Sequence, residues 1–149
     1  MQETLKESKL AEVNSKTRKV FEFIESSKSP LGAYDLLNNP NLRAIGFKAP
    51  TQIYRALNQL LNLRLIHKVE SLNTFIACCS EHETGPSILA ICDNCGQVQD
   101  IPAEHLAAQI EKEVGQKFHG SKELKIELKG VCEECSSDGS EGQATTASQ

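Results

Sequence analysis

Two pairs of cysteines, each spaced as Cys-x-x-Cys, constrain the fold of this chain more than any other feature. They are Cys92 with Cys95 and Cys132 with Cys135, and 36 residues separate the pairs. A Cys-x-x-Cys segment turns two thiolates to one side of a tight knuckle, and two knuckles complete a tetrahedron around zinc. Gly96 follows the first pair, where such a turn favours a left-handed residue. The pattern predicts a structural four-cysteine zinc site that joins the two ends of a strand–helix–strand unit.

Disulfides and buried free thiols are the alternatives to zinc at these cysteines. The first residues, Met1-Gln2-Glu3-Thr4, lack the basic start and the apolar run of a signal peptide. We therefore expect a cytoplasmic protein, and reducing conditions there disfavour disulfides. The longest apolar runs are too short to cross a bilayer, so no membrane partner is expected.

Charge divides the 149 residues into two different halves. Residues 1–77 contain 11 basic and 7 acidic side chains, a net charge of +4, whereas residues 78–149 contain 5 basic and 13 acidic ones, a net charge of −8. The overall net charge of −4 alone would argue against a nucleic-acid partner. The division instead predicts two units with different partners, of which the first is suited to a polyanion.

The first half has the pattern of several helices followed by a two-stranded ribbon. A fourth helix begins at Pro50 and has one apolar stripe with helical spacing. The other expected elements are a helix over 5–13, a helix capped by Ser15 or Thr17, a helix over 33–37, a loop from there to Ala49, and a hairpin of 65–70 and 74–78. This order is typical of a winged helix-turn-helix, so we expect such a domain over residues 1–79.

The second half is expected to be a small α/β domain over residues 87–135. A polar hinge over 80–86 precedes it, and a Ser/Gly/Thr-rich tail over 136–149 is expected to be disordered. The expected elements are strands over 87–91, 98–101 and 124–128 and an amphipathic helix over 103–117. The fold class is therefore α+β.

A second group of possible metal ligands lies between the two halves of the sequence. If Ser71-Leu72 forms the turn of the hairpin, His67 and Cys78 are diagonal neighbours on one face, about 7–8 Å apart. His82 and Asp100 follow, and one thiolate, two imidazoles and a carboxylate suit zinc. On spacing alone, a surface histidine remains the simpler interpretation, and Cys79 is an alternate ligand.

Three segments in order resemble the ferric uptake regulator family, and within it the zinc uptake regulator branch. They are Gln52-Ile-Tyr-Arg-Ala-Leu-Asn-Gln-Leu, then Leu65-Ile-His-Lys-Val-Glu-Ser-Leu-Asn-Thr-Phe-Ile-Ala-Cys78, and Ile91-Cys-Asp-Asn-Cys-Gly96. The resemblance covers roughly Thr17 to Cys135, and His-Lys-Val-Glu-Ser-x-Asn followed by Cys78 is its most branch-specific part.

The resemblance implies a zinc-responsive transcriptional repressor that binds pseudo-palindromic, A·T-rich operators as a homodimer and represses zinc-uptake genes. It implies two zinc ions per chain, one structural and one regulatory. The second half would be the dimerisation domain. The regulatory ligands carried over to this chain are His67, Cys78, His82 and Asp100.

The resemblance also implies that the fourth helix enters the major groove of DNA. Arg55 can donate two hydrogen bonds to guanine, and Tyr54 can contact a thymine methyl or a phosphate. The alternatives to DNA contact are a core or half-buried packing role for Tyr54 and a solvated surface charge for Arg55. The further expected contacts are Thr51 and Asn58 to bases or backbone, and Lys48, Arg64 and Lys68 to phosphates.

Three other functions compete with the zinc-responsive repressor. The same scaffold can sense nickel, iron or peroxide, although Lys129 stands where iron-type members often have a ligand histidine. A zinc hydrolase is disfavoured because no H-E-x-x-H is present and a four-cysteine site leaves no open position for water, so we expect no enzymatic activity and no small-molecule substrate. A zinc-ribbon interaction module would leave the Tyr54-Arg55 face unexplained.

Overall fold

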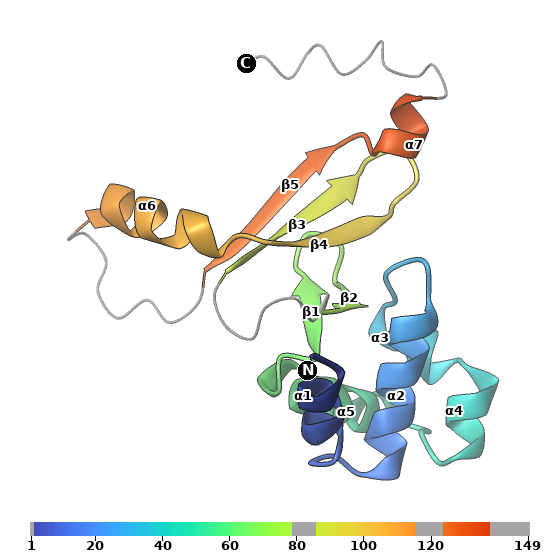
Figure 1. The fold of residues 1–149 in the computed structure, drawn as a ribbon. Coiled ribbons are helices and arrows are strands. Elements are labelled where there is room, and N and C mark those ends of the chain that lie inside the picture. Colours follow the sequence, from blue (N-terminus) through green and yellow to red (C-terminus); the bar gives the residue numbers. More distant parts are fainter. Residues whose placement is uncertain (1, 79–85, 116–123, 138–149) are drawn as a thin grey trace. The chain divides into compact units, whose positions relative to one another are not determined.

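The computed structural model describes residues 2–78, 86–115 and 124–137. The chain forms two compact units, Met1–Glu81 and His82–Gln149, which we describe one at a time (Figure 1). Most of the predicted hinge (80–86) and most of the predicted tail (136–149) lie outside the described residues. Among the described residues, no helix combines the length and the apolar character that a membrane span requires.

The first unit consists of helices followed by an antiparallel hairpin, as the sequence predicts. Its described elements are α1 (Gln2–Leu10), α2 (Ser15–Ser26), α3 (Ala33–Leu37), α4 (Pro40–Ala44), α5 (Pro50–Asn62), β1 (Ile66–Val69) and β2 (Thr74–Ala77). α5 buries Ile53, Leu57 and Leu60 against the apolar face of α2. The apolar stripe predicted for this helix therefore forms the centre of the core of the first unit.

Three predictions for the first unit were wrong in detail. The first helix runs from Gln2 to Leu10 and not over 5–13. The N-cap of α2 is Asn14, whose side chain accepts a hydrogen bond from the Thr17 amide at 2.8 Å, and not Ser15 or Thr17. The loop predicted between α3 and α5 contains the helix α4, which Asn39 caps and Pro40 begins. An Asn-Pro pair that ends one helix is equally suited to start the next, because proline is favoured in the first turn.

The hairpin has the register that the sequence predicts. Ile66 lies opposite Ala77, and His67 lies opposite Ile76. The Cys78 amide then bonds to the Leu65 carbonyl at 2.9 Å, which extends the same register by one pair. A bridge between Leu31 and Phe75 adds a third backbone segment to the ribbon. The sheet of the first unit is therefore tied both to the end of α5 and to the segment before α3.

The end of α5 has the hydrogen bonds of a Schellman motif. The Arg64 amide bonds to the Leu61 carbonyl at 3.0 Å and the Leu65 amide to the Leu60 carbonyl at 3.0 Å. Arg64 occupies the position that usually requires glycine, and its φ is 60°. A left-handed backbone costs a non-glycine residue steric strain, so the turn at Arg64 is strained.

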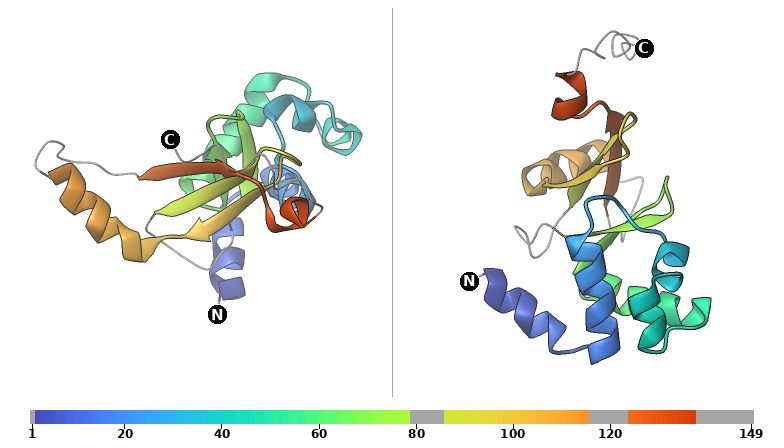
Figure 2. Two further views of the ribbon diagram at one scale, coloured as in Figure 1. Left: turned by 90° about the horizontal axis from the view of Figure 1, so that it is seen from above. Right: turned by 90° about the vertical axis from the view of Figure 1, so that its right-hand side faces the viewer.

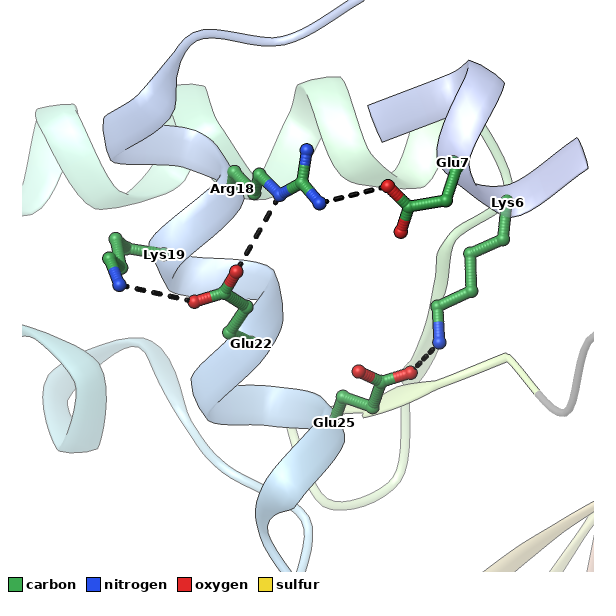
Figure 3. Close-up of polar contacts among 6 residues, drawn as sticks. All are labelled: Lys6, Glu7, Arg18, Lys19, Glu22 and Glu25. Carbon is green, nitrogen blue, oxygen red and sulfur yellow. Dashed lines mark hydrogen bonds and ion pairs between the residues drawn. The ribbon is translucent and has the colours of Figure 1, made fainter. Parts of the chain in front are cut away.

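α1 is attached to α2 by ion pairs and by one buried leucine. Lys6 pairs with Glu25, and Arg18 bridges Glu7 at 2.9 Å and Glu22 at 3.6 Å (Figure 3). These partners are partly exposed, and exposed pairs each contribute only about 0–1 kcal/mol. Leu10 lies in the core, and burying a leucine contributes about 1.5–3 kcal/mol. Apolar burial therefore dominates the attachment of α1, and the ion pairs set its direction.

The second unit is a three-stranded sheet with a crossover helix. Its described elements are β3 (Ser87–Cys92), β4 (Val98–Pro102), α6 (Glu104–Val114), β5 (Lys125–Gly130) and α7 (Glu133–Ser136). β3 lies between its antiparallel neighbour β4 and its parallel neighbour β5 (Figure 2). The strand–helix–strand unit predicted between the cysteine pairs is present, and the short helix α7 was not predicted.

The apolar core of the second unit is thin. Its buried apolar side chains among the described residues are Leu89, Ile91, Cys92 and Ala103, and α6 has none. Leu128 on the edge strand β5 is 59% exposed.

We predict that Arg64→Gly stabilises the first unit by about 1 kcal/mol, because glycine removes the steric cost of φ at 60°. Urea unfolding of the purified chain measures the change. The matched control is Asn73→Gly, at φ 52°, where the gain is smaller because asparagine tolerates this region. An Arg64→Gly variant less stable than the unmodified chain would contradict the assignment of strain.

Candidate metal centres and nucleic-acid interface

The four cysteines of the two Cys-x-x-Cys pairs lie together in the second unit. The sulfur atoms of Cys92, Cys95, Cys132 and Cys135 are all within 4.8 Å of one another. Cys92 ends β3 and Cys132 precedes α7, and the parallel register places Cys92 opposite Gly130. The strand pairing thus brings two knuckles to one end of the sheet although 36 residues separate them.

The spacing of the sulfur atoms fits zinc. The Sγ atoms of Cys95 and Cys132 are 3.8 Å apart. Two sulfurs at opposite ends of a tetrahedral edge, each about 2.3 Å from zinc, would lie about 3.8 Å apart. A disulfide needs about 2.05 Å, and the described cysteines are free thiols. Gly96 has φ at 80°, as predicted for the first knuckle.

Three backbone amides stabilise the thiolate form of Cys92. The amides of Asn94, Cys95 and Cys132 point to its Sγ at 3.3–3.4 Å. Those of Cys95 and Cys132 lower the pKa of Cys92 most, and the pKa falls from 9.0 to about 6 despite burial. One ligand of the four is therefore largely ionised at neutral pH before any metal binds.

The pKa values of Cys95 and Cys135 shift in the opposite direction. The Asn94 side chain lowers the pKa of Cys135, but contacts with Cys132 and with the other thiols, together with desolvation, raise it to about 12. The Gln97 amide lowers the pKa of Cys95, but desolvation and the contacts with Cys92 and Cys132 raise it overall. Adjacent sulfurs cannot all be ionised without a cation between them.

The hairpin of the first unit holds the second pair of candidate ligands. The ligand atoms of His67 and Cys78 lie within 4.8 Å of each other, on the diagonal that the register predicts. Asp100 lies in β4 of the second unit, opposite Leu89. His82 and the alternate ligand Cys79 lie outside the described residues.

The polar residues predicted on α5 face solvent. Thr51, Arg55 and Asn58 are exposed, opposite the buried stripe. Tyr54 is 39% exposed, so its ring is partly covered and partly open to solvent. Lys48 precedes the helix and Arg64 follows it, and both are exposed. One helix therefore presents two hydrogen-bonding side chains and a guanidinium, with a cation at each end.

Lys68 differs from the other predicted phosphate contacts. It is half-buried, and its Nζ lies 3.7 Å from the Glu70 carboxylate. A neighbouring carboxylate offsets the charge that a phosphate would attract.

Two residues near the expected interface escaped the sequence analysis. Arg43 lies exposed in the last turn of α4, a helix that was predicted to be a loop. Gln52 caps the start of α5 with its side chain. Its position three residues after the cap residue is the sequence signal that could have identified it.

We predict that zinc binding at pH 7 releases at least two protons per four-cysteine site, because Cys95 and Cys135 must ionise to become ligands. Calorimetry in two buffers of different ionisation enthalpy counts the protons. Zinc affinity is expected to rise from pH 6 to pH 8. A pH-independent affinity with no proton release would contradict this protonation pattern.

Comparisons with known proteins point in one direction. No family model matches the chain. It is 34% identical over 106 residues to the zinc uptake regulation protein of Escherichia coli (strain K12), and equally to that of Shigella flexneri. The matched region is 70% of this chain and 61% of each relative, so the chain spans about three fifths of the length of the curated relatives it matches.

Solved structures give a longer match. A zinc uptake regulator complexed with zinc and DNA is 29% identical, with a TM-score of 0.79 over 93% of this chain and 96% of that chain. The holo form of XcZur is 25% identical, with a TM-score of 0.75 over 92% of this chain and 99% of that one. A ferric uptake regulator of Francisella tularensis with iron is 19% identical, with a TM-score of 0.52, and shares the fold.

The order of motifs and the paired knuckles agree with these likenesses in both sequence and fold. In sequence and in fold the chain is similar to zinc uptake regulators, and it shares the fold of a ferric uptake regulator.

Proposed function

We propose that this chain is a zinc-responsive, DNA-binding transcriptional repressor of zinc-uptake genes and not an enzyme. The observation that supports it best is the combination of an exposed polar face on α5 with thiol and imidazole ligands in the adjoining hairpin. The likeness to a zinc uptake regulator that was solved with zinc and DNA supports the same function. Repressors act where the DNA is, and the free thiols suit the reducing cytoplasm.

The four cysteines of the second unit form the structural zinc site in this proposal. Four thiolates fill a tetrahedral zinc site and leave no position for a substrate. The metal then links the end of β3 to the start of α7 and supplements a thin apolar core. Zinc here is part of the fold, so its removal unfolds the unit.

A second, regulatory zinc uses His67 and Cys78 in this proposal. We propose Asp100 and His82 as its further ligands, which gives two zinc ions per chain. A set of one thiolate, two imidazoles and one carboxylate favours zinc over iron and manganese. Fewer thiolates than in the structural site make this zinc the more easily removed of the two.

The regulatory site would act by selecting one arrangement of the chain, the one in which its ligands come together. Zinc shifts the equilibrium only as far as it binds that arrangement more tightly than the others. Operator binding is then coupled to zinc, because both favour the same arrangement.

The first unit, residues 1–79, would read the operator through α5. Arg55 has the geometry for two hydrogen bonds to a guanine, and Tyr54 and Asn58 lie on the same exposed side. Lys48 and Arg64 would contact phosphates at the two ends of the helix, and Thr51 adds a hydroxyl. Lys68 contributes less, because Glu70 offsets its charge.

The second unit, residues 87–135, would join two copies of the chain. β5 is an edge strand, and its Leu128 is exposed. α6 has no fully buried residue. A second copy pairing along β5 would satisfy the open edge and cover this apolar surface. The homodimer would present two α5 helices to the two halves of a pseudo-palindromic operator.

The alternatives are separated by the same measurements. Equal responses to nickel or iron(II) would indicate a regulator of another metal, and the thiolate argues against this for iron. A zinc-ribbon interaction module would bind no operator.

We predict that His67→Ala and Cys78→Ser each weaken zinc-dependent operator binding at least tenfold, because each removes a ligand of the regulatory zinc. Gel shifts with and without chelator measure the response, beside zinc counting per chain. The control is Ser8→Ala, an exposed residue on α1, which should leave the response unchanged. Unchanged zinc stimulation in both hairpin variants would contradict the site.

We predict that Arg55→Ala lowers operator affinity by about 1–3 kcal/mol, roughly five- to 150-fold, while zinc content and unfolding stay as in the unmodified chain. Fluorescence anisotropy of labelled operator measures the affinity. The control is Arg18→Ala on the outer side of α2, an arginine occupied by Glu7 and Glu22. Equal affinities of both variants would contradict the role of α5.

A further inference from the structure

The start of α5 is held by one side chain, that of Gln52. Its Oε1 accepts hydrogen bonds from the Lys48 amide at 2.7 Å and from the Ala49 amide at 3.1 Å. The backbone amide of Gln52 in turn donates a hydrogen bond to the Ala49 carbonyl at 3.1 Å. Because both side-chain partners are N–H donors, the oxygen of the Gln52 amide must face them.

The backbone of Lys48 is fixed on its other side as well. Phe47, the preceding residue, is buried, and its amide bonds to the Leu42 carbonyl at 3.1 Å. The Nζ of Lys16 lies over the Phe47 ring, 5.0 Å from the ring centre. Lys48 is therefore an exposed cation between a buried anchor and the capped end of α5.

The choice of glutamine at this position has a physical meaning. A glutamate would accept the same two hydrogen bonds, and its charge would add a favourable interaction with the positive end of the helix. Glutamine forgoes that stabilisation and stays neutral beside Lys48. A negative charge at this place would disfavour the approach of a phosphate to Lys48.

We propose that Gln52 is a positioning residue for DNA binding. Its neutral side chain holds the backbone of Lys48 and Ala49 in place before DNA binds, so that Lys48 contacts a phosphate without any further ordering of these two residues. The inference rests on the proposed function. Without the cap, residues 48 and 49 are not ordered before binding, and the entropy cost of ordering them opposes the contact of Lys48 so that this one phosphate contact is lost.

The test uses the full zinc-loaded chain and a labelled duplex that this chain has selected from a random-sequence pool. Gln52→Met keeps the size and helix preference of the side chain and removes the acceptor. We expect it to weaken binding about five- to tenfold and to lower the slope of log K against log salt by about 0.9, as the loss of one phosphate contact does. The same loss is expected in Lys48→Ala.

A double-mutant cycle separates positioning from a general loss of stability. Gln52→Met combined with Lys48→Ala should bind no more than about twofold more weakly than Lys48→Ala alone, because both act on one contact. Independent effects that add, or an unchanged salt slope in Gln52→Met, would show a purely structural cap and overturn the inference.

Gln52→Glu tests the neutral charge. It keeps the acceptor, so its thermal midpoint should equal or exceed that of the unmodified chain, while its operator affinity should fall at least fivefold. Affinity equal to that of the unmodified chain would overturn the inference. If binding is lost in Arg55→Ala but unaffected by Gln52→Met, the inference alone fails. If the unmodified chain selects no duplex with zinc, the proposed function fails with it.

Discussion

The parallel pairing of β3 with β5 is the interaction on which the second unit depends. Neighbouring parallel strands run in the same direction, so the chain must return to the starting end through a crossover, here the segment that includes α6. This pairing sets Cys92 opposite Gly130, and the Asp93 amide bonds to the Gly130 carbonyl at 2.7 Å. Two knuckles far apart in sequence thereby share one end of the sheet, and the long gap between the pairs is a requirement of the topology.

Much of the fold could be predicted from the sequence where the pattern and the local chemistry agree. The stripe on α5 and the strands of the hairpin were predicted because burial imposes periods of 3.6 and 2 on them. The helix α4 was missed because Asn39-Pro40 was interpreted only as a stop signal. The left-handed conformation of Arg64 is determined by the hydrogen bonds at the end of α5.

The candidate sites divide along a similar line. The four-cysteine cluster follows from spacing, since two knuckles on one metal allow few arrangements. The diagonal of His67 and Cys78 follows from the register of the hairpin. The weak position of Lys68 could not be predicted, because its ion pair with Glu70 depends on side-chain direction. The capping role of Gln52 likewise depends on which backbone amides the helix start leaves open.

The sparse burial in the second unit has a consequence for how this protein responds to dilution. Few side chains are buried among the described residues of this unit, and anything that binds its folded form raises the folded population by mass action. If a second copy covers β5 and α6, halving the protein concentration reduces the folded fraction as well as the fraction of dimers. Unfolding and dissociation then become one equilibrium, and the amount of the protein in a cell becomes one of the determinants of its fold.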